Sequence, residues 1–414
     1  MNLYLIFRNH RIIFNNTIYL SIIEVVRLIL PLAVIPYLLR IVGIEKYGIV
    51  AFVQSIITYF SVTIDFGLAI PAVHNISERR DDKIYLGQLV FSIIIIKVIL
   101  FFIASITLTI MIFSIPLFRL NLLLFYGAFL MCIYDIIFPV WYFQGVERMK
   151  IITIIKFISI ILYVLLVFLF IRKPDDYIFI PFFQSVGLVV SGFIGFIFLC
   201  RDIRLIFPSC NMIWNIFKSG IPFFISKLSI IFNVNVGRIL TGFFLGMGDV
   251  AALDIAQRIY TAMTIPIGMF NQAVFPHNSM KKNLAQATKF LLLTILLAVF
   301  ISAITYIMIP YIIRYLVNEQ LEQACFLSRL FCVQIIFAGI SWYLGSSVLV
   351  AFGYKKIFNE SIIYATVIML LMYFSIYLLG IKSLLGFALM IILYEALIAL
   401  YRLYYCLKYK LIRL

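Results

Sequence analysis

FSIIIIKVILFFIASITLTIMIF (91–113) is apolar apart from four serine and threonine residues and a single charged residue, Lys97, near its first third. About 20 apolar residues in succession form a helix long enough to cross the bilayer core. A transmembrane β-strand would instead alternate polar and apolar residues, so a β-barrel is excluded. The whole chain has this character, because 65% of its 414 residues are hydrophobic and only 12% are charged. A soluble core could not bury so much apolar surface. The sequence therefore predicts an all-α polytopic membrane protein.

Short polar breaks divide the chain into twelve predicted transmembrane helices. Seven of these breaks are SERRDDK, QGVERMK, RKPDDY, RDIRL, HNSMKKN, NEQLEQ and YKKIFNES. The six spans of the first half are expected at 17–39, 47–70, 84–113, 120–143, 151–171 and 177–200. Those of the second half are expected at 220–246, 251–275, 289–316, 323–352, 362–379 and 384–405.

The net charge of +16 follows from where the basic residues fall. The N-terminus, the even-numbered loops and the C-terminal segment, in which we count Arg402, hold about three times as many bases as the odd-numbered loops. Cytoplasmic loops carry such an excess, so both termini are expected in the cytoplasm. This explanation needs no nucleic-acid partner.

The two halves of the chain resemble each other. VGIEKYGIVAFVQ (42–54) aligns with LGMGDVAALDIAQ (245–257), and the same offset of 203 relates His74–Asn75 to His277–Asn278. We therefore expect two six-helix bundles, residues 1–206 and 207–414, around a central cavity. Six is an even number, so both bundles would have the same orientation, and a substrate path would lie between them. The alternative is chance similarity between apolar hairpins.

Charged residues inside the apolar runs are the candidate functional residues. A base at the centre of a span costs about 2.5–3.5 kcal/mol, so such residues face the protein interior or a water-filled cavity. Lys97 and Arg329 are explained by local pairing or by a position near a span end. The remaining bases are predicted to bind substrate: Arg27, Lys227, Arg238 and Arg258.

Two acids in the same spans are candidates for ion coupling. Glu24 lies three residues before Arg27, and Asp254 lies four residues before Arg258, so each acid can pair within its own helix. The competing interpretation is that both are structural ion pairs. Lys227 and Arg238 are 11 residues apart, which places both on one helix face, and no acid lies in their own span.

Sequence motifs for other chemistries are absent. There is no GxxxxGK[ST] phosphate loop, HExxH, GxSxG or Cys/His ligand set. No polar segment is long enough to be a separate catalytic domain. We therefore expect neither an enzyme nor a protein with a cofactor or metal site.

Several segments together resemble the O-antigen flippases, the polysaccharide-transport branch of the multidrug/oligosaccharidyl-lipid/polysaccharide exporter superfamily. WYFQGVERMK (141–150) is the most specific of them. The others are PYLLRIVGIEKYG (36–48), DFGLAIPAVHNIS (65–77), GIPFFISKLSIIF (220–232) and AVFPHNSM (273–280). The order and spacing of these segments match the family over the whole chain.

The resemblance implies a flippase that moves undecaprenyl-diphosphate-linked O-antigen units, or related polysaccharide units, from the cytoplasmic to the periplasmic leaflet of the bacterial inner membrane. The implied partners are that lipid-linked oligosaccharide, membrane lipid, an O-antigen polymerase and a chain-length regulator. The alternative is a cation-coupled multidrug exporter of the same superfamily, which would favour acids in its cavity. A membrane glycosyltransferase or O-antigen polymerase is disfavoured because every odd-numbered loop is short.

Overall fold

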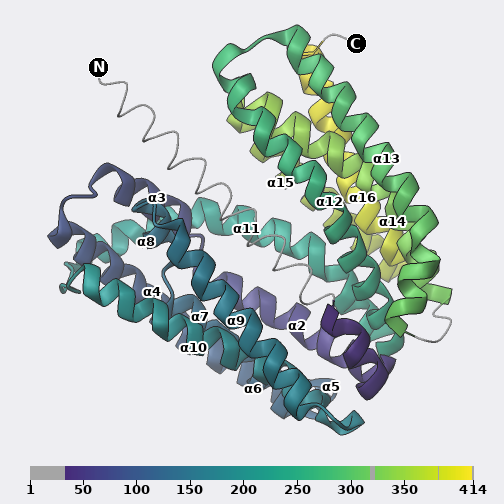
Figure 1. Cartoon of the computed structure of the whole chain (residues 1–414), viewed down its shortest axis with the longest axis horizontal. Helices are drawn as coiled ribbons and strands as arrows, with labels where there is room; N and C mark the ends of the chain where they lie inside the picture. The colour runs from purple at the N-terminus through teal and green to yellow at the C-terminus, as the bar shows by residue number, and fades with distance from the viewer. Residues whose placement is uncertain (1–32, 318–321, 381, 413–414) are drawn as a thin grey trace. The chain divides into compact units, whose positions relative to one another are not determined.

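The computed structural model describes residues 33–412 except 318–321 and 381, and all regular structure in this part of the chain is helical (Figure 1). The candidate residues Glu24 and Arg27 lie outside the described residues. The all-α prediction is confirmed.

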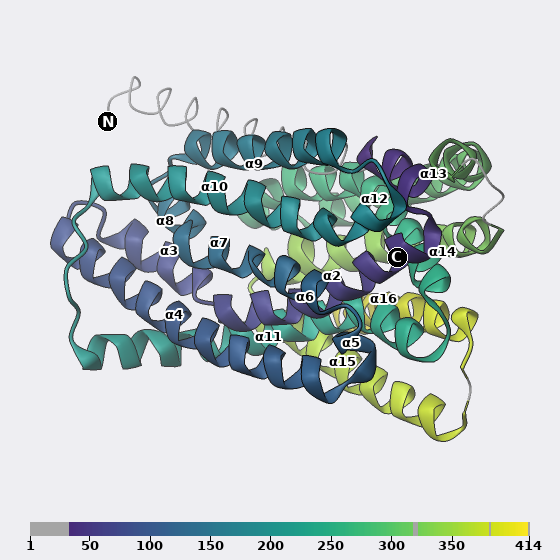
Figure 2. The same ribbon diagram turned by 90° about the horizontal axis from the view of Figure 1, so that it is seen from below.

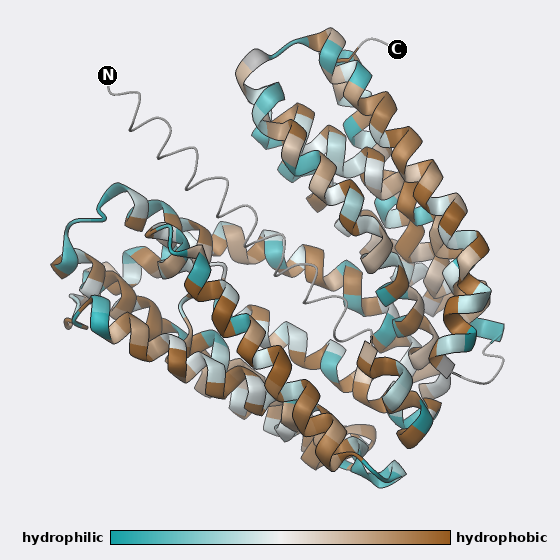
Figure 3. Ribbon diagram, viewed as in Figure 1, coloured by the Kyte–Doolittle hydropathy of each residue, from teal (hydrophilic) through white to brown (hydrophobic). Residues whose placement is uncertain are grey.

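Ten helices among the described residues are long and apolar enough to cross a membrane. They match ten of the twelve predicted spans, and hydrophobic residues predominate along the ribbon in Figure 3. The first predicted span falls mostly outside the described residues, which begin with a short helix, Ala33–Val42. The eighth lies within α12 (Met247–Lys281), which is long enough to span but contains more polar residues. The prediction of a multi-pass membrane protein is confirmed.

The surfaces of several helices suit lipid rather than water. α4 (Lys83–Ser114) and α13 (Leu284–Val317) carry large apolar side chains that are more than half exposed. Continuous apolar surface of this extent is not stable in water, whereas lipid chains solvate it readily. The exposed residues include Ile99, Phe102, Ile106 and Ile110 on α4, and Leu296, Phe300 and Ile307 on α13.

The described chain forms two compact units. The first contains the described residues up to Val42 together with Ile56–Leu228, and the second contains Gly43–Ser55 and Ser229–Leu414. α2 (Ile44–Asp65) and α11 (Cys210–Phe244) therefore each contribute to both units. The predicted division at residue 206 and the predicted cavity between the bundles stay predictions.

In the first unit, α9 (Met149–Phe170) runs along α10 (Phe179–Asp202), as both views show (Figures 1 and 2). A Cβ atom on Gly187 would lie 2.6 Å from the Ser159 carbonyl oxygen, so the two backbones approach closely. Short elements connect the long helices of this unit. They are α3 (Ala69–Glu78), α5 (Pro116–Arg119), α6 (Leu122–Phe129), α7 (Met131–Ile137), α8 (Val140–Gly145) and the 3₁₀ turn η1 (Pro174–Ile178).

In the second unit, α14 (Glu322–Trp342) packs against α12, α13 and α16 (Leu384–Lys408), and α15 (Lys355–Leu378) packs against α16. The π-helical segment η2 (Tyr343–Val350) continues α14. Arg402, counted with the cytoplasmic bases, is only 4% exposed and donates hydrogen bonds to the Ser341 carbonyl and the Ser361 hydroxyl. A Cβ atom at position 345 would collide with this guanidinium, so glycine at this position makes room for the arginine.

Two spans of the first unit are interrupted within the membrane region. α2 ends at Asp65, and Phe66 and Gly67 then adopt left-handed backbone angles before α3 begins. The following span is divided into α6, α7 and α8, with an extended residue at Phe138 before Pro139. Interrupted helices occur at membrane depth only where protein or a water-filled cavity satisfies the freed backbone groups.

Loops from alternate positions in the sequence meet at one end of the first unit. Arg80 pairs with Glu147 at 2.6 Å, and Arg148 pairs with Asp202. The hydrogen bond from Arg80 lowers the pKa of the Glu147 carboxyl, which lies outside the spans. The Tyr37 hydroxyl donates to the Ile171 carbonyl, which lies in a loop of the other predicted set. These contacts agree with the alternation of loops that the twelve-span interpretation requires.

Reporter fusions test which set of loops is cytoplasmic. Fusions after residues 80, 149, 204, 282 and 356 are expected to report the cytoplasm, and fusions after 44 and 174 the periplasm, because the basic loops stay inside. Alkaline phosphatase and fluorescent-protein reporters at each site make the measurement. Inverted results at two or more sites would contradict the predicted topology.

Candidate functional site

Asp65 is the centre of a charged cluster in the first unit. Its carboxylate accepts from Lys97 Nζ on α4 at 2.8 Å and from Lys227 Nζ on α11 at 2.6 Å. The Asp65 side chain is 14% exposed and Lys97 only 3%, whereas Lys227 is 45% exposed. One buried acid thus holds two bases, and the more exposed base is Lys227.

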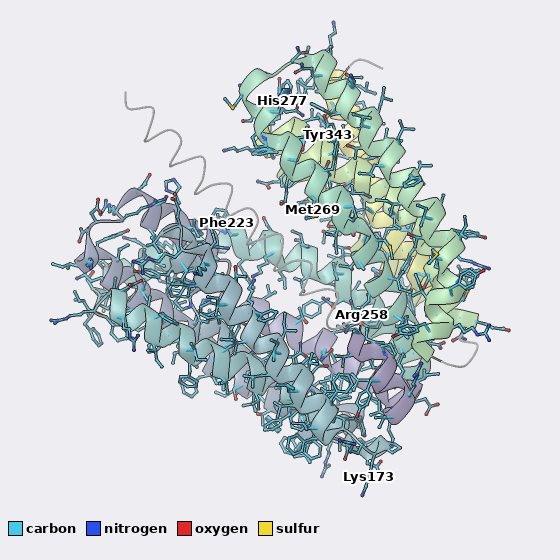
Figure 4. The ribbon with its side chains drawn as sticks, viewed as in Figure 1. Lys173, Phe223, Arg258, Met269, His277 and Tyr343 are labelled. Carbon is cyan, nitrogen blue, oxygen red and sulfur yellow. The ribbon has the colours of Figure 1, made fainter. Side chains whose placement is uncertain are left out.

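The interruption after α2 positions Asp65. Phe66 stacks against both Phe217 and Phe224, with ring centroids 4.5 and 4.7 Å apart. A Cβ atom on Gly67 would lie 2.5 Å from the Phe224 backbone nitrogen, so only glycine allows the turn to approach α11. Figure 4 labels the neighbouring Phe223 on this part of α11. The segments at 65–77 and 220–232 are therefore packed together, and Asp65 meets Lys227 as a result.

Asp135, on α7, is a second acid beside this cluster. Its carboxylate accepts from the Ser61 hydroxyl at 2.6 Å. Its backbone oxygen accepts from Lys97 Nζ at 3.0 Å, so the same ammonium group contacts both Asp65 and Asp135.

Asp254 is the centre of a cluster in the second unit. Its side chain is 1% exposed and lies 2.6 Å from Arg258 Nε and 3.0 Å from Arg238 Nη1. The Tyr47 hydroxyl donates to the same carboxylate at 2.8 Å. Arg238 also donates to the Gln257 side chain. As in the first cluster, the acid is buried and a base is more exposed, here Arg258 at 34% (Figure 4).

The repeated segments pack against each other in this second cluster. Tyr47 lies in the segment 42–54 and Asp254 in the segment 245–257. A Cβ atom on Gly48 would lie 1.7 Å from the Met247 carbonyl oxygen, so these two backbones are in close contact. The two segments that resemble each other in sequence are therefore also in contact in the structure.

The structure describes four of the six predicted site residues and places them in two different clusters. Lys227 pairs with Asp65, whereas Arg238 and Arg258 both pair with Asp254. Asp65 and Lys97 are not among the predicted site residues. Asp65 directly precedes the Phe-Gly turn, which is the sequence signal that marks it. Arg329, the other base within the described apolar runs, lies over the Tyr306 ring at 5.2 Å.

The segment 273–280 contains Asn278, which links α12 to η2. Asn278 donates to the Tyr343 hydroxyl at 3.1 Å and to the Ser347 carbonyl at 2.8 Å. The labelled His277 and Tyr343 lie toward the same end of the second unit (Figure 4). His277 contacts Gln286 at 3.0 Å. Among the described residues, three or more His, Cys, Asp or Glu side chains nowhere gather in a group that could hold a metal ion.

These features define a multi-pass helical membrane transporter with charged clusters at interrupted or paired helices. The chain belongs to the polysaccharide biosynthesis protein family, whose model matches residues 13–282. An Escherichia coli (strain K12) protein named as a candidate O-antigen transporter is 25% identical over 369 residues, covering 87% of this chain and 89% of the relative. The resemblance to the polysaccharide-transport branch is confirmed.

Solved structures show the same fold. The lipid II flippase MurJ in an inward closed conformation aligns with a TM-score of 0.73 and 16% identity, over 95% of this chain and 87% of that structure. An inward-facing multidrug resistance transporter of the MATE family aligns with a TM-score of 0.68 and 15% identity, over 92% of this chain and 94% of that structure. The fold is therefore common to both functional classes that the sequence left open.

Replacing Gly67 should destabilise the first unit. Gly67→Ala introduces a left-handed alanine, which costs about 1–2 kcal/mol, and overpacks the Phe224 backbone, which costs about 1–3 kcal/mol more. Gly43→Ala is the matched control, because Gly43 has a similar positive φ but open space at its Cβ position. Thermal unfolding in detergent should show the lower midpoint for Gly67→Ala. Equal midpoints for the two variants would argue against the close packing at Gly67.

Proposed function

We propose that the chain is a flippase that moves undecaprenyl-diphosphate-linked O-antigen or related polysaccharide units from the cytoplasmic to the periplasmic leaflet of the bacterial inner membrane. Family membership, the names of its relatives and a fold shared with a lipid II flippase support this proposal. The twelve-span topology with both termini in the cytoplasm is part of the proposal, as are the O-antigen polymerase and chain-length regulator as partners.

The observation that carries the proposal is the contrast in exposure within each cluster. Asp65 and Asp254 are 14% and 1% exposed, whereas Lys227 and Arg258 are 45% and 34% exposed. Such clusters present positive charge to a ligand and keep their acids covered. A diphosphate carries negative charge that lysine and arginine bind through charge-assisted hydrogen bonds. A cation exporter would need the opposite arrangement.

The predicted substrate-binding bases remain Arg27, Lys227, Arg238 and Arg258. Arg238 and Arg258 converge on one carboxylate, so their guanidinium groups lie close to each other. Two planar guanidinium groups at one place suit the two phosphates of a diphosphate, because each can bind bidentately. Lys227 supplies a compact point charge on the first unit.

Removing these bases should reduce transport. In a host that depends on this chain for surface polysaccharide, Lys227→Ala or Arg238→Ala should lower the surface polysaccharide roughly tenfold, the loss expected for one charge-assisted hydrogen bond. Arg238→Lys should restore part of the activity, because it keeps the charge but not the planar fork. Electrophoresis of the surface polysaccharide, with immunoblots of membrane protein, makes the measurement.

Arg329→Ala is the matched control for this experiment. Arg329 is also a base within an apolar helix, but its guanidinium lies over the Tyr306 ring, so its loss should leave transport near the normal level. Lys227→Ala removes a binding group and also leaves Asp65 with one base fewer. Lys227→Ala combined with Asp65→Asn restores the charge balance, so transport that stays low in this double variant reflects lost substrate binding. Full activity in the Lys227→Ala, Arg238→Ala double variant would refute these residues as the anion site.

Asp254 and Glu24 remain the proposed coupling acids. For Asp254 to change its protonation, a diphosphate would first have to displace it from Arg238 and Arg258. Asp254→Asn and Glu24→Gln should then give folded protein whose transport in reconstituted vesicles no longer responds to a pH gradient. If both variants keep the wild-type response, Asp254 is a fixed structural partner of the two arginines, and coupling lies elsewhere.

A further inference from the structure

Asp135 differs from the acids that hold the two clusters. It is partly buried on the short helix α7, and its carboxylate accepts from the Ser61 hydroxyl at 2.6 Å. Among the described residues, no basic nitrogen forms an ion pair with this carboxylate, whereas Asp65 and Asp254 each have two such partners. A carboxylate in this setting depends for its ionised form on positive charge nearby, or else binds a proton.

In the part of the chain that the structure describes, the nearby charges belong to four side chains. Asp65 on α2 and Asp135 on α7 carry negative charge, and Lys97 on α4 and Lys227 on α11 carry positive charge. Lys97 is the link, because its Nζ lies 2.8 Å from Asp65 Oδ1 and 3.0 Å from the Asp135 backbone oxygen. With all four groups ionised, the cluster is neutral.

Among the described residues, the other titratable side chains around Asp135 are tyrosines and a cysteine, none of which carries positive charge. Tyr134 and Cys132 lie on α7 itself. From α6, Tyr126 hydrogen-bonds to Thr109 at 3.1 Å. α10, which also packs against α7, presents Gly192 and Gly195 to Tyr134 and Phe138. The charge on Lys227 therefore decides whether this group of side chains is neutral.

We propose that Asp135 is a proton-binding site that takes up a proton when Lys227 leaves Asp65 to bind an anionic substrate. Departure of Lys227 leaves two carboxylates with one ammonium group, Lys97. A proton from water then binds to the Asp135 carboxylate and restores neutrality, while the Ser61 hydroxyl can still donate to one of its oxygens. The identity of the substrate in this inference rests on the proposed function, whereas the charge balance of the four side chains does not. Substrate and proton would bind with positive linkage.

Lys227→Met tests the charge balance without any substrate. The variant removes the ammonium group permanently, so Asp135 should be protonated at neutral pH and give a new carboxylic-acid C=O band in the infrared spectrum. The band should shift in frequency in Lys227→Met combined with Asp135→Glu and stay in place in Lys227→Met combined with Asp65→Glu. It should disappear in Lys227→Met combined with Asp65→Asn, because Asp135 and Lys97 then balance each other. Arg329→Met, which removes a base outside the cluster, should give no new band.

The result that would overturn the proposal is a band whose frequency follows the Asp65→Glu change rather than the Asp135→Glu change, or no band in a folded Lys227→Met protein. Size-exclusion profiles establish folding, and Lys227→Gln replaces Lys227→Met if the methionine variant does not fold.

Binding of undecaprenyl diphosphate separates this inference from the proposed function. Wild-type affinity should rise by up to about tenfold per pH unit on acidification, beyond the pH dependence of Asp135→Asn, because one proton is linked to binding. If undecaprenyl diphosphate does not bind while the Asp135 band forms in Lys227→Met, the proposed substrate is wrong and the proton site stands. If it binds with the same pH dependence in wild type and Asp135→Asn, the coupling is refuted and the proposed substrate stands.

Discussion

A carboxylate inside a membrane must be balanced by nearby positive charge, and this constraint organises both units. Asp65 holds Lys97 and Lys227, which come from α4 and α11. Asp254 holds Arg238 and Arg258, and Tyr47 from α2 donates to it. Removing one partner of a buried pair costs about 3–5 kcal/mol. Each acid therefore fixes helices that are distant in sequence, and the glycine contacts around it let those helices approach.

α2 and α11 take part in both clusters. α2 supplies Tyr47 to the second cluster and Asp65 to the first, whereas α11 supplies Lys227 to the first and Arg238 to the second. Each of these helices is divided between the two units because the residues at its two ends have partners in different units. A helix whose polar residues are satisfied at separate sites need not have a continuous polar stripe. This explains why Ile231 and Val234 lie between Lys227 and Arg238 on α11.

Hydropathy alone predicted most of the fold, because the polar breaks between apolar runs are short and clear. Helical spacing also predicted the Asp254–Arg258 pair, which lies within one helix. It could not predict Asp65–Lys97 or Asp65–Lys227, because those partners lie 32 and 162 residues apart and meet only through tertiary packing. The same spacing grouped Lys227 with Arg238, but eleven residues of helix place them about 16 Å apart along α11, and they pair with different acids. Arg402 was counted by its sequence position with the cytoplasmic bases, and sequence position could not predict that it is buried. It is buried because Ser341 and Ser361 accept its hydrogen bonds and Gly345 leaves room for its guanidinium.

The two clusters differ in the kind of base they use, and this difference suits different tasks. The second contains arginines, whose planar forks keep a fixed geometry and bind phosphate bidentately. The first contains lysines, whose compact ammonium groups on flexible chains can exchange one oxygen partner for another. Among the residues that the structure describes, the first cluster also has an additional acid, Asp135, that shares a lysine through its backbone oxygen. An exchangeable base beside a spare carboxylate can convert anion binding into a change of protonation, whereas arginines fixed by Asp254 and Gln257 are better suited to holding an anion in one orientation.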